Sequence, residues 1–354
     1  MAELRELTPL SRAMNKHKLL LTLILFLVHC GSSDEGNPSS NEPFLNPFAS
    51  TFSVNDFNPR CEYLGIPEIY PPPYEGQELS CRTSDRLFYL YLPKEYSEIE
   101  AAFPAMFSLH GYTSTAETNI NYTDFQKLAD EESFIVIYPQ GLVHETKGGT
   151  HWNIDEIGPG NSVNSIAFLE SVLDWTGENF NVDLKRFYSA GMSNGGFMSY
   201  HLACNISSKI AAVASVTGAM SSFTYDNCSA QPTSVLQIHG TDDSVVPYAG
   251  SLTASGVGFV GIDNVMDFWA RNNSCDLEPT IFPIPDISGD GQGGSHKVFS
   301  NCANGVSVEL YLLDGMGHEW PGKYERYGGS DEFDIISAEV IWSFFNQFNI
   351  DGRM

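Results

Sequence analysis

Apolar residues fall into short runs and helix-spaced stripes that alternate along the chain from residue 85 onward. The predicted strands are 86–93, 103–111, 134–139, 185–191, 211–218, 234–240 and 306–315. Helical spacing is found at 122–132, 163–180, 195–204, 262–272 and 333–348. Strands that alternate with helices predict a mostly parallel sheet covered on both faces. The pattern therefore predicts one α/β fold, with no internal repeat and no second domain.

The N-terminal segment has the pattern of a signal peptide. Two lysines precede an apolar run at 19–28 that only one threonine interrupts. This run is too short to cross a bilayer but suits the core of a signal peptide. We therefore expect residues 1–29 to be removed. Met14 is an alternative start of translation, because an ordinary signal peptide begins there.

Cys30 ends this segment and opens a stretch rich in Ser, Asn, Pro and Asp. The arrangement resembles a bacterial lipoprotein signal, in which the chain is cut before a cysteine that is then acylated. His29 departs from it, because a small residue is usual there. We expect lipidation at Cys30 and a flexible tether at 30–60, ahead of a catalytic domain at 61–354. The alternative is an ordinary signal peptide cut a few residues later.

Composition and charge limit the partners. The chain has 354 residues, of which 42% are hydrophobic, and a formal net charge of −26. That size suits one large globular domain or two small ones. The negative charge should repel nucleic acid and anionic membrane surfaces. We therefore expect a monomer without a nucleic-acid partner, which would contact a membrane only through an N-terminal lipid.

The cysteines after the signal segment are even in number. An exported chain meets an oxidising compartment, so disulfides are expected, although six cysteines can pair in fifteen ways. We expect sequential pairing because it closes short local loops, and buried free thiols are the alternative. The predicted pairs are Cys61–Cys81, Cys204–Cys228 and Cys275–Cys302.

The stretch GMSNGG, residues 191–196, places a serine between a predicted strand and a predicted helix. Strand, sharp turn and helix together are the setting of a nucleophile elbow. Gly191 and Gly195 would remove the side chains that clash in such a turn. The serine, Ser193, would then lie above the carboxyl ends of the strands, where sites of open α/β sheets form.

A serine nucleophile needs a base and an acid, which follow it in that fold in the order acid, then histidine. Asp242 and Asp243 come directly after the strand 234–240, and His318 follows the last strand. The other later histidine, His296, lies in a glycine-rich stretch that we predict to be a loop. Each residue alone could be structural, but their order and placement agree with a Ser–His–Asp hydrolase.

Two backbone amides should bind the oxyanion that forms in such a reaction. One belongs to Asn194, the residue after the nucleophile, and Tyr112, in the loop HGYTST after the strand 103–111, is the expected second donor.

The motifs LHGY, HWN, RFYSAGMSNGGFMSYHLAC, IHGTDDSVVPY and GMGHEWPG occur in that order. They resemble the secreted polyhydroxybutyrate depolymerase-like esterases, a family of α/β-hydrolases that also contains feruloyl and acetylxylan esterases. The resemblance covers roughly residues 80–350. It implies Ser193 as nucleophile, His318 as base and Asp243, not Asp242, as acid.

The resemblance also implies a substrate cleft near Tyr112, Trp152 and Trp320, and no cofactor. Aromatic rings beside the serine would suit a phenolic acyl group or a sugar face. The alternative is that both tryptophans are core residues.

Two positions depart from the family pattern. Asn164 stands where an acidic residue is expected, and the stretch 283–299 looks expanded. In that stretch Asp286, Ser288 and Asp290 alternate as in a calcium loop, but Lys297 stands where the closing acidic residue belongs. We therefore expect a polar surface loop and no metal.

These features predict a secreted or surface-tethered serine carboxylesterase that acts on feruloyl or acetyl esters of xylan. The alternative within enzymes is a polyester depolymerase, whereas a peptidase is disfavoured because no additional propeller-sized domain is present. The alternative of another class is a non-catalytic binding protein that has kept the fold.

Overall fold

A computed structural model of the chain describes residues 57–64, 75–252, 258–289, 291–322 and 333–354. All of them belong to one compact unit. The predicted signal peptide, the lipidation site Cys30 and the predicted tether up to residue 56 lie outside the described residues. The first described strand begins at Arg60, one residue before the predicted start of the domain.

An eleven-stranded mixed sheet forms the centre of the described part of the chain. In spatial order its strands are β1 (Arg60–Tyr63), β2 (Gln77–Arg82), β3 (Leu87–Leu92), β5 (Ile135–Pro139), β4 (Phe103–Leu109), β8 (Val182–Met192), β9 (Ala212–Val216), β10 (Ser234–Gly240), β15 (Val308–Leu313), β14 (Gly294–Phe299) and β13 (Thr280–Ile284). The six strands β5, β4, β8, β9, β10 and β15 pair with one another in parallel. The remaining pairings, which begin with β3 on β5 and β14 on β15, are antiparallel. The predicted α/β-hydrolase class is therefore confirmed, with antiparallel strands added at both edges.

Short hairpins and helices complete the fold. The hairpins are β6 (Leu142–Val143) with β7 (Thr150–His151), β11 (Ser251–Leu252) with β12 (Gly258–Phe259), and β16 (Phe348–Asn349) with β17 (Gly352–Arg353). The helices are α1 (Ala116–Thr123), α2 (Phe125–Glu132), α3 (Ser165–Asn179), α4 (Asn194–Asn205), α5 (Ser222–Asn227), α6 (Ile262–Asn272) and α7 (Ser337–Phe345), with a 3₁₀ turn at Ala303–Gly305.

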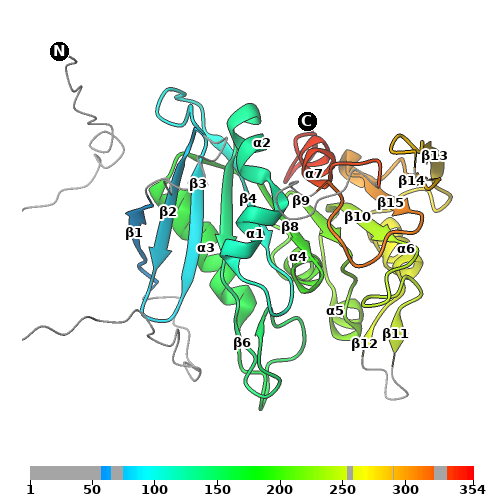
Figure 1. The fold of residues 1–354 in the computed structure, drawn as a ribbon, viewed down its shortest axis with the longest axis horizontal. Helices are drawn as coiled ribbons and strands as arrows, with labels where there is room; N and C mark the ends of the chain where they lie inside the picture. The colour runs from blue at the N-terminus through cyan, green and yellow to red at the C-terminus, as the bar shows by residue number, and fades with distance from the viewer. Residues whose placement is uncertain (1–56, 65–74, 253–257, 290, 323–332) are drawn as a thin grey trace, which may run out of the picture. The chain divides into compact units, whose positions relative to one another are not determined.

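Helices cover both faces of the sheet (Figure 1). The apolar residues of α3, α4 and α6 share one buried cluster, and those of α1, α2 and α7 share the other. Successive residues of β5 divide between the two clusters: Ile135 and Ile137 pack in the first, and Val136 and Tyr138 in the second. Because both faces are buried, the central strands are almost continuously apolar, which is why the sequence predicted them.

Every predicted strand is present, but four details differ from the prediction. The helix predicted at 122–132 is two helices, which meet at Asp124 with φ 57°. The helix predicted at 333–348 begins only at Ser337. His296 lies in strand β14 rather than in a loop, so that prediction was wrong. The edge strands β1, β2, β13 and β14 were not predicted, because β1, β2 and β14 are more polar than the central strands and β13 is mostly exposed.

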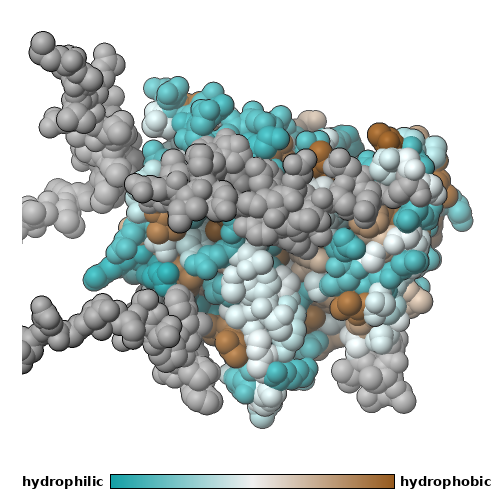
Figure 2. Space-filling view, viewed as in Figure 1, coloured by the Kyte–Doolittle hydropathy of each residue, from teal (hydrophilic) through white to brown (hydrophobic). Residues whose placement is uncertain are grey.

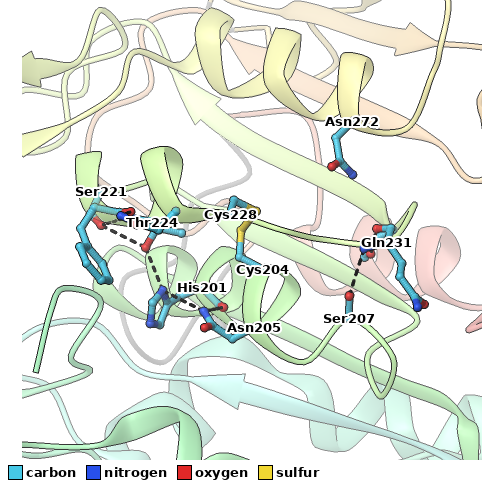
Figure 3. The surroundings of a disulfide bond; sticks show 12 residues. His201, Cys204, Asn205, Ser207, Ser221, Thr224, Cys228, Gln231 and Asn272 are labelled. Atoms are coloured by element: carbon cyan, nitrogen blue, oxygen red, sulfur yellow. Dashed lines mark hydrogen bonds between the residues drawn. A yellow bond between two sulfur atoms is a disulfide. The ribbon is translucent and has the colours of Figure 1, made fainter.

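The three disulfides are those that the sequence predicted. Cys61–Cys81 joins β1 to β2, and Cys275–Cys302 joins the two ends of the β13–β14 hairpin. Cys204–Cys228 ties the last turn of α4 to the end of α5 (Figure 3). Stable disulfides are typical of extracytoplasmic proteins, which agrees with the predicted export.

On the face that Figure 2 shows, the visible described residues are mostly hydrophilic or intermediate in hydropathy, and hydrophobic residues form separate small patches. None of the helices formed by the described residues has both the length and the apolar character needed to span a bilayer.

Candidate active site

Ser193 occupies a strained turn between β8 and α4. Its backbone has φ 53° and ψ −121°, a conformation that residues other than glycine rarely adopt. A Cβ on Gly191 would lie 2.4 Å from the Gly195 carbonyl carbon, and one on Gly195 would lie 2.1 Å from the Leu109 oxygen. Both glycines are therefore required by close backbone contacts, as the nucleophile-elbow prediction expects.

The turn is fixed by the neighbouring strand and opens directly into a helix. The Ser193 amide donates a hydrogen bond to the Val216 carbonyl at 2.8 Å. Helix α4 begins at the next residue, Asn194, so the amides of its first turn point toward the serine end. A helix N-terminus stabilises negative charge, which suits a site where an oxyanion develops.

The predicted base and acid form a direct pair. His318 Nδ1 lies 2.8 Å from Asp243 Oδ2, the side chain of Asp243 is fully buried, and that of His318 is 18% exposed. Asp242 is exposed, and its nearest side-chain partner is its neighbour Thr241. The choice of Asp243 over Asp242 agrees with this geometry, because only Asp243 contacts the histidine.

Close backbone packing brings the loop that contains Asp243, the acid loop, to the loop that contains His318. The Asp242 amide donates to the Met316 carbonyl at 3.0 Å, two residues before His318. Gly240, at the end of β10, lies so near this carbonyl that a Cβ would come within 1.9 Å of it. The glycine in HGTDD therefore permits the contact between the two loops.

Hydrogen bonds keep Asp243 ionised despite its burial. Burial alone would raise the pKa of this carboxyl, but the bonds from His318 and from the Val246 and Val245 amides outweigh it and lower the pKa. The two amides donate to Oδ1 at 2.8 and 2.9 Å, which leaves Oδ2 for the imidazole. A carboxylate held in this way fixes the Nδ1–H tautomer of His318 and leaves Nε2 to act as a base.

A buried series of hydrogen-bonded polar side chains supports the acid loop. The Tyr200 hydroxyl donates to Gln237 Oε1 at 2.7 Å, Gln237 Nε2 lies 3.0 Å from His239 Nδ1, and His239 Nε2 lies 2.8 Å from the Val246 carbonyl. Burial lowers the pKa of His239, which keeps its ring neutral. The sequence analysis missed this series. Its signal was the presence of Gln237 and His239 in the otherwise apolar strand SVLQIHG.

The loop after β4 passes beside the nucleophile. A Cβ on Gly111 would lie 3.5 Å from Ser193 Cβ, so the Tyr112 amide follows directly after this approach. Among the described residues, neither the Tyr112 amide nor the Asn194 amide has a hydrogen-bond acceptor. Both predicted oxyanion donors are therefore placed near Ser193 with their N–H groups available.

His110 holds this loop in place. Its Nδ1 donates to the Gly111 carbonyl at 2.8 Å, and its Nε2 accepts from the Gly141 amide at 2.9 Å. Burial lowers the pKa of His110 to about 4, so the ring stays neutral at physiological pH and can keep one donor and one acceptor.

The two tryptophans are not exposed in a cleft, which corrects the substrate-binding prediction. Trp152 is 1% exposed, and its indole N–H donates to the His110 carbonyl at 2.9 Å. Trp320 is 2% exposed and packs edge-on against Phe125. Tyr112 is the exposed aromatic residue of the three, and its hydroxyl donates to the Gly148 carbonyl. The alternative that both tryptophans are core residues is thus the better description.

The two departures from the family pattern have structural explanations. Asn164 is the N-cap of α3, and its side chain accepts from the Ala167 amide at 2.9 Å. Asp286 accepts hydrogen bonds from the Gly289 and Gly291 amides at 2.7 and 2.9 Å, so its oxygens organise a turn. Asp290 lies outside the described residues, and the described part of the chain contains no cluster of three metal-ligating side chains.

Residues 87–256 match the family described as "Esterase PHB depolymerase". This segment therefore resembles that family. A bifunctional acetylxylan esterase/xylanase of Neocallimastix patriciarum is 27% identical over 75% of this chain and 34% of its own length. Feruloyl esterase B of Piromyces equi is 29% identical over 71% of this chain and 43% of its own length. The chain thus spans less than half of these two relatives.

A poly(3-hydroxyalkanoate) depolymerase of Paucimonas lemoignei is 24% identical over 70% of this chain and 63% of its own length. Among solved structures, an acetyl xylan esterase from Aspergillus awamori superimposes with a TM-score of 0.51 at 13% identity. That likeness covers 81% of this chain and 99% of the other, and it confirms the fold alone.

Proposed function

We propose that the domain is a serine carboxylic-ester hydrolase with Ser193 as nucleophile, His318 as base and Asp243 as acid. The observation that supports this most is the hydrogen-bonded pair of His318 and the buried Asp243, together with a strained serine at the start of α4. The match of residues 87–256 to the family described as "Esterase PHB depolymerase" supports the same chemistry.

In the proposed reaction His318 takes the proton of Ser193 as its oxygen attacks the ester carbonyl. Asp243 accepts a hydrogen bond from the Nδ1–H group of His318 and stabilises the imidazolium that forms. The amides of Tyr112 and Asn194 bind the oxyanion. The alcohol leaves with the proton from His318, and water then releases the acid by the same two steps. Each step uses the side chains and amides of this chain, and the second step also uses water.

We propose plant cell-wall esters, feruloyl or acetyl groups on xylan, as the substrates. The names of the relatives from Neocallimastix patriciarum and Piromyces equi support this class. A polysaccharide-linked ester is neutral at the reacting group, which suits a protein of net charge −26. The second candidate, a polyhydroxyalkanoate ester, is favoured by the relative from Paucimonas lemoignei.

We further propose that the protein works outside the cytoplasm as a monomer, with a lipid on Cys30 that tethers it to a cell surface. The three disulfides support an extracytoplasmic site of action. The lipid is proposed from the signal pattern alone, and mass spectrometry of the N-terminal peptide tests it.

A panel of three substrates tests the activity: methyl ferulate, p-nitrophenyl acetate and a short hydroxybutyrate oligomer, each with wild type and Ser193→Ala. Preference for methyl ferulate that the variant loses supports a feruloyl esterase. Activity only on the acetate favours a deacetylase, and activity only on the oligomer favours the second candidate. No hydrolysis of any of them would reject the proposal in favour of a non-catalytic binding protein.

A further inference from the structure

Trp152 contacts both of the segments that carry the proposed oxyanion amides. Its backbone amide donates to Asn194 Oδ1 at 2.6 Å, and its carbonyl accepts from Asn194 Nδ2 at 3.1 Å. Both halves of the Asn194 side-chain amide are therefore used on one partner. This pair of hydrogen bonds fixes Asn194, the residue directly after the nucleophile, to Trp152.

The side chain of Trp152 holds the other segment. Its indole N–H donates to the His110 carbonyl at 2.9 Å, and the two rings lie 4.9 Å apart between centroids. His110 is two residues before Tyr112, whose amide is the proposed second donor. One buried residue thus bonds to the Asn194 segment through its backbone and to the Tyr112 segment through its ring.

Trp152 is itself held in a fixed frame by the residues that follow it. The Asn153 amide donates to Ser165 Oγ at 2.9 Å, and Asn153 Nδ2 donates to the Val163 carbonyl at 2.9 Å. The Ile154 carbonyl accepts from the hydroxyls of Ser221 and Thr224 at 3.0 and 3.1 Å.

Figure 3 shows Thr224 bonded to His201 of α4, beside the Cys204–Cys228 disulfide. The frame around Trp152 is therefore anchored to the C-terminal half of the helix that begins at the nucleophile.

We propose that Trp152 is a positioning residue that sets the spacing between the Tyr112 and Asn194 amides. This inference rests on the proposed function. Oxyanion donors act on charge that develops in the transition state, so a change in their spacing should lower kcat and leave substrate binding nearly unchanged. A tryptophan that contacted the substrate would show the opposite split, because its loss would raise KM.

The test compares Trp152→Phe, Asn194→Leu and the double variant, with p-nitrophenyl acetate as substrate. Phenylalanine keeps an aromatic ring but removes the N–H bond to His110, and leucine removes both side-chain bonds while the Asn194 backbone amide stays. We expect each single variant to lose about 10- to 100-fold in kcat, with KM within about twofold, since removal of a whole donor costs about 10²–10³. The double variant should lose less than the product of the singles, because both act on one frame.

Trp269→Phe is the matched control. Trp269 is fully buried on α6, and its indole N–H bonds to none of the described residues. It should lose thermal stability and keep kcat. A raised KM with unchanged kcat in Trp152→Phe would overturn the proposal, and so would an unchanged kcat or an equal loss in the control. Failure of the wild type to hydrolyse the ester would instead reject the proposed function itself.

Discussion

The central strands and the outer strands of one sheet are held in different ways. All seven residues of β10 are buried, and its carboxyl end leads into the loop that contains Asp243. On β13, at the far edge, Ile281 is 60% exposed and Phe282 50%. Burial on both faces fixes the strands that carry the site. The outer strands are less constrained, because they pair with only one other strand or leave side chains exposed to solvent.

Two of the three disulfides lie at the edges, where burial is weakest. Cys61 and Cys81 are register partners on β1 and β2, and Cys275–Cys302 closes the β13–β14 hairpin. The third, Cys204–Cys228, lies behind α4 in the central region. The comparison therefore assigns a role in stability alone to the edge disulfides, and precision of the site to the buried central strands and the disulfide behind α4.

The largest expected effect on kcat is the difference between substituting Ser193, beside the central strands, and substituting Ser295 on an edge strand. Ser193→Ala should lower kcat by about 10⁴-fold or more, because no other group can form the acyl intermediate. Ser295→Ala on β14 should keep activity within about twofold, since Ser295 lies on an antiparallel edge strand. Ester hydrolysis by both variants, with folding checked by circular dichroism, measures this. Equal losses would break the distinction between centre and edge.

The next largest expected effect on kcat is the difference between substituting two adjacent aspartates, Asp243 and Asp242. Asp243→Asn should lower kcat by about 10³- to 10⁴-fold, because an amide in place of the carboxylate favours the wrong tautomer of His318. Asp242→Asn should cost less than about threefold, since this side chain is exposed. Steady-state kinetics of the pair measures the difference, and the reverse order would show that the acid is misassigned.

Removal of disulfides sharpens the comparison further. The pairs Cys61–Cys81 and Cys204–Cys228 close loops of similar length, with separations of 20 and 24 residues. Replacing either pair with serines should cost about 3 kcal/mol of unfolding free energy. Only the loss of Cys204–Cys228 should also lower kcat, by about three- to tenfold, because that bond supports the frame around Trp152.

Denaturant unfolding and kinetics of the two double variants, at a temperature where both are folded, measure this effect. A loss of kcat in the Cys61–Cys81 variant alone would contradict the assignment of precision to the central region.

The smallest effect concerns pH. Burial lowers the pKa values of His110 and His201 to about 4, below the value of about 6.5 expected for the unfolded chain. Between pH 6.5 and 4 the unfolded state therefore binds more protons, so the free energy of unfolding should fall as pH falls through this window. Each buried imidazole should contribute about 1–3 kcal/mol to that fall.

His201→Asn should make this pH dependence shallower, as denaturant unfolding between pH 4.5 and 7.5 would show. The lowered pKa of Asp243 places its own titration below this window. Identical pH dependence in wild type and variant would show that His201 is not held neutral by burial.

The central strands and the site motifs could be predicted from sequence because their signals are local. Runs such as SVLQIHG report burial on both faces, and GMSNGG reports a turn that only glycine neighbours permit. The pairing of His318 with Asp243 agreed with the sequence because the fold fixes the chain order of acid and base. The edge strands were missed because their alternation is weak and their pairing depends on the finished sheet.

The role of Trp152 could not be predicted from sequence. An aromatic residue beside a serine suits either a substrate cleft or a core, and only the positions of His110 and Asn194 in three dimensions distinguish the two. The same is true of His239, since its bond to the Val246 carbonyl depends on how the acid loop folds back.

Labelling of the folded protein with a fluorophosphonate probe, followed by peptide mapping, tests the central claim most directly. The probe reacts with serines that a neighbouring base activates. Our account predicts a single adduct on Ser193, formed rapidly in the wild type and absent or strongly slowed in Asp243→Asn. No adduct, or an adduct on another serine, would contradict the assignment of Ser193, His318 and Asp243 as the catalytic site.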